Sequence, residues 1–278
     1  MNEMIIADPL KSLDFLECMF GPEGTLHLIA ISEGEPPEAK SFVPEQRRAL
    51  LLWVQQREGR SNIYFAANRL ADGFMNRKAK KENVAAALML HVDVDDPDAL
   101  ERVSAFTPKP TAVVFSGGGY QAFWLLKEPM QDLGRVEAIN KAIAGSLGGD
   151  NCHNIDRIMR LPGTINVPDA KKRAKGRVEA LAYLVSEETD WSRRYELSDF
   201  AALLTVVAVT ARDLAPVDLT DLPEKVSEET RALIKQGDDK DRPIGSSKPR
   251  FKSRSEALWR VARDLAQANC SWPRSQAF

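Results

Sequence analysis

An apolar strand that ends in two carboxylates constrains the fold of this chain most. The segment from Leu88 to Asp96 reads Leu-Met-Leu-His-Val-Asp-Val-Asp-Asp. Side chains alternate between the two faces of a strand, so Asp93 and Asp95 point the same way, with Cα atoms roughly 6.6 Å apart. Two such acids can bracket a divalent cation, which suits phosphoryl and nucleotidyl transfer. The alternative is that they end the strand and start a helix at Asp-Pro-Asp.

Composition limits the setting and the partners. The 278 residues are 44% hydrophobic and carry a net charge of −2. This allows one large domain with a small appendage, and a nucleic-acid partner would need a local basic patch. Cys18, Cys152 and Cys270 form neither a disulfide framework nor a zinc motif, which indicates a reducing cytoplasm. The sequence contains neither a signal-peptide pattern nor a membrane-spanning apolar run, so we expect a cytoplasmic protein without a membrane partner.

Hydrophobic periodicity predicts an α+β fold with a partly antiparallel sheet. Three consecutive glycines between two apolar runs indicate a tight hairpin, and Pro129 is expected to end its second strand. The predicted strands are 25–31, 63–67, 88–95, 111–115 and 120–126, and the predicted helices are 44–58, 97–105 and 131–147.

The composition changes after about residue 205. Residues 206–252 are rich in Pro, Asp, Glu, Lys and Ser, and we interpret them as a linker with a short helix near 223–236. A final amphipathic helix is expected in residues 253–278. It is interpreted either as an element that packs back on the core formed by residues 1–205 or as the start of a further domain.

Three further segments carry polar groups that could join the two acids. The hairpin exposes backbone N–H groups that can bind phosphate, with Ser116 and Gln121 beside Gly118. Most glycine turns only connect strands, so this signal is weak alone. After helix 131–147, Asp150 and Asp156 each offer a third carboxylate. The alternatives are that Asp150 belongs to the turn ending that helix and that Asp156 pairs with an arginine.

Arginines and lysines follow these acids. Arg157 and Arg160 lie in Arg-Ile-Met-Arg-Leu-Pro-Gly-Thr-Ile-Asn, which ends at Asn166. The planar guanidinium group is well suited to binding a triphosphate. Residues 171–177 contain five basic residues, which favours contacts to backbone phosphate, although charge runs are usually solvated.

These segments resemble, in order, motifs I, II and III of the archaeo-eukaryotic primase superfamily. The resemblance is strongest to plasmid and phage primase-polymerases with RepB-type primase domains, and it covers roughly residues 60–185. Motif I corresponds to Val92-Asp-Val-Asp95, motif II to residues 116–124 and motif III to residues 155–166. Gln121 stands where motif II usually has histidine, and it offers a neutral amide in place of a cation.

The resemblance implies a primase catalytic core with a mixed, largely antiparallel RNA-recognition-motif-like sheet flanked by helices, plus a small helical C-terminal extension. It implies Mg²⁺ or Mn²⁺ held by Asp93, Asp95 and either Asp150 or Asp156, with the Gly-Gly-Asp sequence favouring Asp150. The residues implied to bind nucleotide are Ser116, Gly118, Gln121, Arg157, Arg160, Asn166 and Lys171. For the template, we expect Arg77, Lys78, Lys172 and Arg173.

The expected activity is synthesis of primers, and extension of strands, on single-stranded DNA from nucleoside triphosphates in plasmid or phage replication. A replicative helicase is an expected partner. Two other interpretations stay open. One is a replication initiator that binds DNA through a degenerate primase fold, with turnover lost through Gln121. The other is a metal-dependent phosphodiesterase or nuclease that uses the same acids.

Overall fold

The computed structural model describes residues 6–204, 222–251 and 253–268. The chain divides into two compact units, residues 1–208 and 209–278. Within the described residues, none of the helices combines the length and the apolar character that crossing a membrane requires.

The first unit contains two larger antiparallel sheets and a short two-stranded ribbon, β9–β10, which confirms the predicted α+β class. One sheet has the order β11-β6-β7-β5-β4, and the other has the order β2-β1-β3-β8. The strands are β1 (Leu26–Ile31), β2 (Glu38–Phe42), β3 (Asn62–Ala66), β4 (Arg69–Leu70), β5 (Val84–Val94), β6 (Ala112–Phe115), β7 (Tyr120–Met130), β8 (Ile158–Arg160), β9 (Ile165–Asn166), β10 (Ala180–Leu181) and β11 (Tyr183–Leu184).

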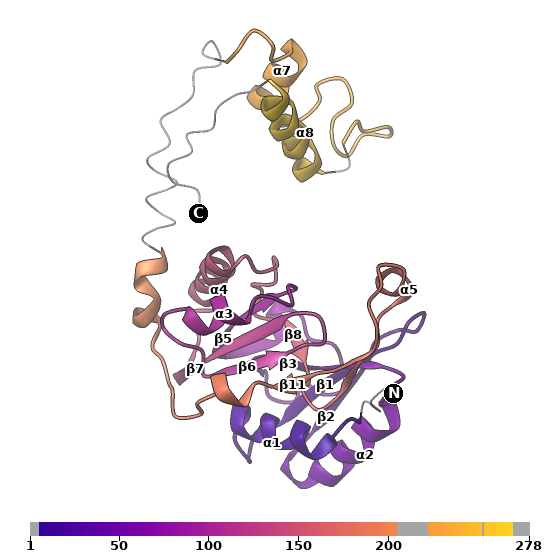
Figure 1. Ribbon diagram of the computed structural model, residues 1–278, viewed down its shortest axis with the longest axis vertical. Coiled ribbons are helices and arrows are strands. Elements are labelled where there is room, and N and C mark those ends of the chain that lie inside the picture. Colours follow the sequence, from indigo (N-terminus) through magenta and orange to yellow (C-terminus); the bar gives the residue numbers. More distant parts are fainter. Residues whose placement is uncertain (1–5, 205–221, 252, 269–278) are drawn as a thin grey trace. The chain divides into compact units, whose positions relative to one another are not determined.

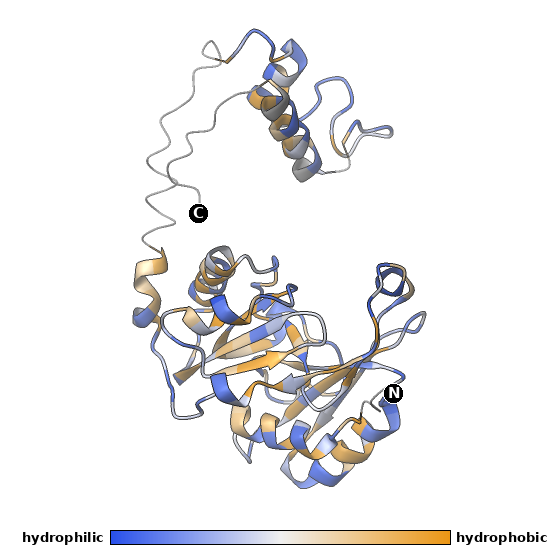
Figure 2. Ribbon diagram, in the orientation of Figure 1, coloured by the Kyte–Doolittle hydropathy of each residue, from blue (hydrophilic) through white to orange (hydrophobic). Residues whose placement is uncertain are grey.

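Helices cover the sheets from two sides (Figure 1). Helices α3 and α4 share one hydrophobic core with β5 and β7, and α1 and α2 share a second core with β1 and β3. The exposed turn around α5 is strongly hydrophilic, whereas the strands of the five-stranded sheet are mostly hydrophobic (Figure 2). The helices of this unit are α1 (Pro9–Phe20), α2 (Arg47–Arg57), α3 (Leu100–Ala105), α4 (Leu133–Leu147) and α5 (Ala170–Arg173).

The central pair β5–β7 brings the predicted motifs together. Successive β5 residues alternate between the cores, with Leu90 in the α4 core and Met89 in the other, and Asp93 pairs with Gln121 across the ladder. The prediction that Pro129 ends the second strand is wrong, because β7 continues to Met130. The β5–β7 register shifts just before this end, and a bulge tolerates a proline that cannot donate to the ladder.

Helix α1, which the sequence analysis did not predict, holds the Pro-Gly turn that follows β8. The side chain of Asp8 caps the helix by accepting from two backbone N–H groups, and Pro9 occupies the first turn. The backbone N–H of Asp8 donates to the Gly163 carbonyl at 2.8 Å, and the Ser12 hydroxyl donates to the Pro162 carbonyl at 2.7 Å. Gly163 has a φ of +83°, and a Cβ there would lie 2.5 Å from the Asp8 carbonyl oxygen.

The second unit has a small core of its own. Helices α7 (Glu228–Gln236) and α8 (Arg254–Gln267) bury Leu233 and Val261 together with Phe251. The Thr230 hydroxyl also donates to the Asp264 carboxylate at 3.0 Å. The predicted short helix therefore packs against the final helix, although the sequence analysis placed it in a linker.

Candidate active site

A polar pocket of about 370 Å³ lies where β5, β7 and β8 meet the glycine hairpin, and we call it the carboxylate pocket. Acidic and basic side chains from distant segments converge on it. Its lining includes Tyr64, Lys78, Asp93, Asp95, Ser116, Gly117, Gly118, Gln121, Asp150, Arg157, Arg160, Asn166, Lys172 and Arg177.

Backbone contacts place Asp150 beside Asp93. Helix α4 ends at Gly148 in the left-handed conformation, and the backbone N–H of Asp150 then donates to the Asp93 carbonyl at 2.8 Å. A Cβ on Gly149 would lie 2.7 Å from Val92 Cγ2, so glycine permits this close approach. Burial raises the pKa of Asp93, and the charges of Asp150 and Asp95 add to this effect, whereas the Gln121 hydrogen bond and Arg157 lower it.

These acids meet the chemical requirements of a divalent-cation site. Oxygen atoms of Asp93 and Asp150 and the sulfur of Cys152 all lie within 4.8 Å of one another. Asp95 is more exposed than Asp93 and lines the same pocket. A bound divalent cation would relieve the repulsion between neighbouring carboxylates, and hard cations such as Mg²⁺ prefer carboxylate oxygens as ligands.

The glycine hairpin packs tightly against its surroundings. A Cβ on Gly117 would lie 2.6 Å from the Asn166 side chain, and a Cβ on Gly119 would collide with the carbonyl oxygen of Val94. The Asn166 amide donates to the Ser116 carbonyl at 2.7 Å. Glycines therefore allow the hairpin to reach both the end of β5 and the β9 residue Asn166.

Arg160 is buried on the pocket wall, and its charge is not neutralised there. Its guanidinium group donates to the oxygens of Asn62, Tyr64 and Asn166 at 2.9 to 3.2 Å and stacks on the Tyr64 ring at 4.4 Å. Arg160 is only about 5% exposed, yet none of the described carboxylates lies within 4.0 Å of its guanidinium group. Burial lowers the pKa of Arg160, and the electrostatic effects of Tyr64 and Asp93 oppose this. A buried, fixed cation of this kind favours an anionic ligand.

Gln121 links this arginine to Asp93. Its Oε1 accepts from the backbone N–H of Arg160 at 2.9 Å, which directs its NH₂ group towards Asp93 Oδ1 at 3.4 Å. The glutamine therefore contacts a predicted cation ligand directly. A neutral amide on β7 can connect Asp93 on β5 with Arg160 on β8 because it both donates and accepts hydrogen bonds.

Arg177 was not singled out by the sequence analysis, although it ends the predicted basic segment. Its guanidinium group donates to Asp95 Oδ1 at 3.1 Å and to the Gly118 carbonyl at 3.0 Å. Asp95 thus has a basic partner, whereas the hydrogen-bond partners of Arg160 among the described residues are neutral. Tyr64 was also missed, because a single tyrosine in a predicted strand carries no signal of a site.

A comparison with protein-family models shows the family to which this chain belongs. The family model described as the RepB DNA-primase N-terminal domain matches residues 40–206, which is more than half of the chain. The chain belongs to this family. The predicted resemblance is confirmed, and the membership supports a primase enzyme. A comparison with curated proteins finds no match.

Solved structures support the same fold for this RepB-type primase domain. The AEP domain of the cyanophage S-2L primase-polymerase (PrimPol) has a TM-score of 0.52 and 17% identity, over 72% of this chain and all of that chain. The catalytic domain of primase RepB′, solved in complex with initiator DNA, has a TM-score of 0.50 and 13% identity, over 74% of this chain and all of that chain.

Four predicted site residues of this RepB-type domain lie outside the lining of the carboxylate pocket. Asp156 has an Oδ1 that is buried without a hydrogen-bond partner among the described residues. Lys171 is exposed, Arg77 stacks on Phe74, and Arg173 pairs with an acid at the end of β1. The other predicted residues all line this pocket.

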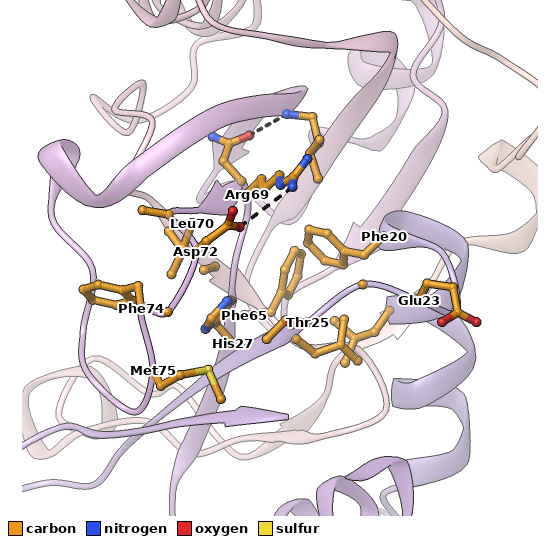
Figure 3. Close-up of a pocket in the computed structure, with 18 residues that line it drawn as sticks. Phe20, Glu23, Thr25, His27, Phe65, Arg69, Leu70, Asp72, Phe74 and Met75 are labelled. Atoms are coloured by element: carbon orange, nitrogen blue, oxygen red, sulfur yellow. Dashed lines mark hydrogen bonds and ion pairs between the residues drawn. The ribbon is translucent and has the colours of Figure 1, made fainter. Parts of the chain in front are cut away.

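A second pocket, of about 460 Å³, lies between α1, β1 and the segment after β4, and we call it the aromatic pocket. Figure 3 shows Phe20, Phe65 and Phe74 around it, with His27 beside Phe65 and Met75 below Phe74 in this view. None of the predicted site residues lines this pocket. Burial lowers the pKa of His27 to about 4, so its imidazole is neutral at pH 7.

Proposed function

We propose that this chain synthesises primers on single-stranded DNA by metal-assisted nucleotidyl transfer. The observation that carries the proposal is the pairing of three carboxylates with a buried, unneutralised arginine in one pocket. Carboxylates suit a divalent cation, and the guanidinium group suits a triphosphate. In the reaction, the 3′-hydroxyl oxygen bonds to the α-phosphorus of the incoming nucleotide and pyrophosphate leaves.

Asp93, Asp95 and Asp150 would hold Mg²⁺ or Mn²⁺. When bound, such a cation favours the ionised hydroxyl and neutralises charge on the phosphates. Asp150 is preferred to Asp156 as the third acid because Asp150 lies with Asp93 in the same cluster of candidate ligand atoms, whereas Asp156 is outside the pocket lining. Arg177 contacts one oxygen of Asp95, Oδ1, so a cation held by Asp95 would compete with this guanidinium group for the carboxylate.

The remaining polar groups would orient the nucleotide. Arg160 presents a fork that is already held by Asn62, Tyr64 and Asn166, so little rotamer freedom is lost on binding phosphate. Ser116 and the backbone of Gly118 border the same space, and Arg157 lies on its wall. Gln121 would fix Asp93 relative to Arg160, while Lys171 would approach the triphosphate from outside.

The DNA template is the proposed macromolecular partner. The similar RepB′ catalytic domain was solved with initiator DNA, which supports DNA binding by this fold. Lys78 and Lys172 at the pocket rim, with Arg77 and Arg173 nearby in the chain, supply positive charge for backbone phosphates. Strand extension, a role in replication of a mobile element and a helicase partner stay predictions of the resemblance, and a cytoplasmic setting stays a prediction from the cysteines and the N-terminal sequence.

The test is primer synthesis on single-stranded DNA with labelled nucleotides and Mg²⁺ or Mn²⁺. The double variant Asp93→Ala, Asp95→Ala should make no product. The matched control Glu23→Ala, Asp72→Ala removes two exposed acids from the aromatic-pocket rim and should retain synthesis. Equal synthesis by wild type and the Asp93, Asp95 variant would overturn the proposal. Intact DNA binding without synthesis by the wild type would favour the initiator interpretation, and DNA cleavage would favour a nuclease.

A further inference from the structure

Cys152 contributes a sulfur atom to the cluster that contains Asp93 and Asp150. Its Sγ lies within 4.8 Å of a carboxylate oxygen of each acid. The residue is about 8% exposed, and its backbone is fixed from two sides. The N–H of Cys152 donates to the Asp150 carbonyl at 2.7 Å, and the fully buried His91 contacts the Cys152 carbonyl through Nε2 at 3.2 Å.

A buried cysteine is commonly a small apolar filler, but this one lies beside two carboxylates. Mg²⁺ prefers oxygen ligands in a near-octahedral shell, whereas a thiolate binds softer cations better. A donor set in which a sulfur joins the carboxylates therefore discriminates between divalent cations in a way that carboxylates alone do not.

We propose that Cys152 is a thiolate ligand in the cation site, so that the site selects Mn²⁺ or a softer divalent cation over Mg²⁺. The inference rests on the proposed function, in that Asp93 and Asp150 are taken as ligands of the cation. On binding, the sulfur–metal bond forms and the thiol proton passes to solvent, with no change in oxidation state.

The first experiment uses Cd²⁺ as the probe, because cadmium bound to a thiolate gives an ultraviolet charge-transfer band. The full chain carrying Cys18→Ser and Cys270→Ser, in which Cys152 is the only thiol, should show the band at one Cd²⁺ per chain. The single variant Cys152→Ser, which keeps the other two cysteines, should lose it. A missing band in the first protein, or an equal band in the second, would overturn the inference.

Variants of the two acids test whether Cys152 binds the metal together with Asp93 and Asp150 or as a reactive thiol alone. Asp93→Asn with Asp150→Asn, in the same Cys152-only background, should weaken Cd²⁺ binding by at least about tenfold, since the two carboxylates nearest the sulfur are removed. An unchanged Cd²⁺ affinity would mean that the thiol binds the metal by itself, and the inference would then fail.

The second experiment measures Mn²⁺ binding by electron paramagnetic resonance, with Mg²⁺ as competitor. Wild type should prefer Mn²⁺ over Mg²⁺ by about tenfold more than either Cys152→Ser or Cys152→Ala does. Circular dichroism would establish that both variants fold. Equal preference in all three proteins would overturn the inference while leaving the proposed function intact. A wild type that binds Cd²⁺ as expected but makes no primers would overturn the proposed function alone.

Discussion

The carboxylate pocket and the aromatic pocket are similar in volume, but they differ in the side chains that line them. The first gathers charged side chains from β5, β8, the α4 end and the basic segment near α5; Arg177 pairs there with Asp95, and Arg160 is held by neutral oxygens such as that of Asn166. The second is lined by three phenylalanines together with acidic and basic side chains such as Asp72 and Arg69, and burial lowers the pKa of its one histidine to about 4. Cavity size alone therefore does not identify a site for nucleotide chemistry; fixed charges without full compensation do.

Removing a carboxylate from the first pocket should have the largest effect. Asp93→Asn or Asp150→Asn should lower the rate of primer synthesis about a thousandfold, equivalent to about 4 kcal/mol of transition-state stabilisation. Asp156→Asn should lower the rate by less than about tenfold, since Asp156 lies outside the lining. Initial rates at saturating Mn²⁺ measure this. If Asp156→Asn were as damaging as Asp150→Asn, the assignment of the third acid would be reversed.

Replacing the fixed cation should have the next largest effect. Arg160→Lys removes the fork that binds Asn62, Tyr64 and Asn166, and kcat/KM for the nucleotide should fall about a hundredfold, or about 2.7 kcal/mol.

The control for Arg160 is Arg57→Lys. Arg57 also stacks on an aromatic ring and binds a side-chain oxygen, but it lies outside both pockets. This variant should keep kcat/KM within about twofold of wild type, as a surface substitution away from the site does. Equal losses from the two lysine variants would mean that Arg160 has only a structural role.

The aromatic pocket should affect stability and its pH dependence. The folded His27 resists protonation until about pH 4, whereas in the unfolded chain the pKa is 6.5. The unfolded state therefore binds more protons between these values, and the free energy of unfolding falls as pH falls through this window. From pH 7 to pH 5, His27 should account for about 2 kcal/mol of the loss.

His27→Gln isolates this contribution, because the buried His91 is present in both proteins. Urea unfolding at pH 7 and pH 5 should show a smaller loss of stability for the variant, by that amount. Parallel pH profiles for wild type and variant would contradict the assignment to His27. Primer synthesis at pH 7 should be the same in both proteins, since His27 lies outside the carboxylate pocket.

The smallest effect should come from reshaping the aromatic wall. Phe74→Leu removes part of a side chain that is about 7% exposed, and it should lower the free energy of unfolding by about 1 kcal/mol. Primer synthesis should stay within about twofold of wild type. A tenfold loss of synthesis without a matching loss of folded protein would remove the functional distinction between the two pockets.

The sequence predicted the central strands and the hairpin well, because their signals are local. Alternating apolar residues before Asp93 and three glycines between two apolar runs need no knowledge of distant segments. Helix α1 was not predicted, although Asp8 and Pro9 form a standard start signal. The extent of β7 past Pro129 depends on a bulge with β5, which no local pattern reveals.

The sequence predicted which residues form the site better than it predicted how they contact one another. Asp150 and Asp156 were both candidates because spacing along the chain does not show which backbone N–H reaches the Asp93 carbonyl. Arg177 was missed for the same reason, since 59 residues separate it from the Gly118 carbonyl that it contacts. Such contacts arise from tertiary packing, which residue type and periodicity along the chain do not predict.

The hydrogen bonds between the α1 region and the Pro-Gly turn limit how far this protein can be shortened at its N-terminus. The matched family region begins at residue 40, so a fragment cut to that region would lack Asp8 and Ser12. The turn they secure joins β8, which carries Arg160, to β9, which carries Asn166. Trimming to the recognised boundary would therefore remove α1 and its contacts to this turn, together with β1 and part of β2 of the four-stranded sheet, while leaving every motif residue in the sequence. Such a fragment should keep its motifs and bind nucleotide poorly.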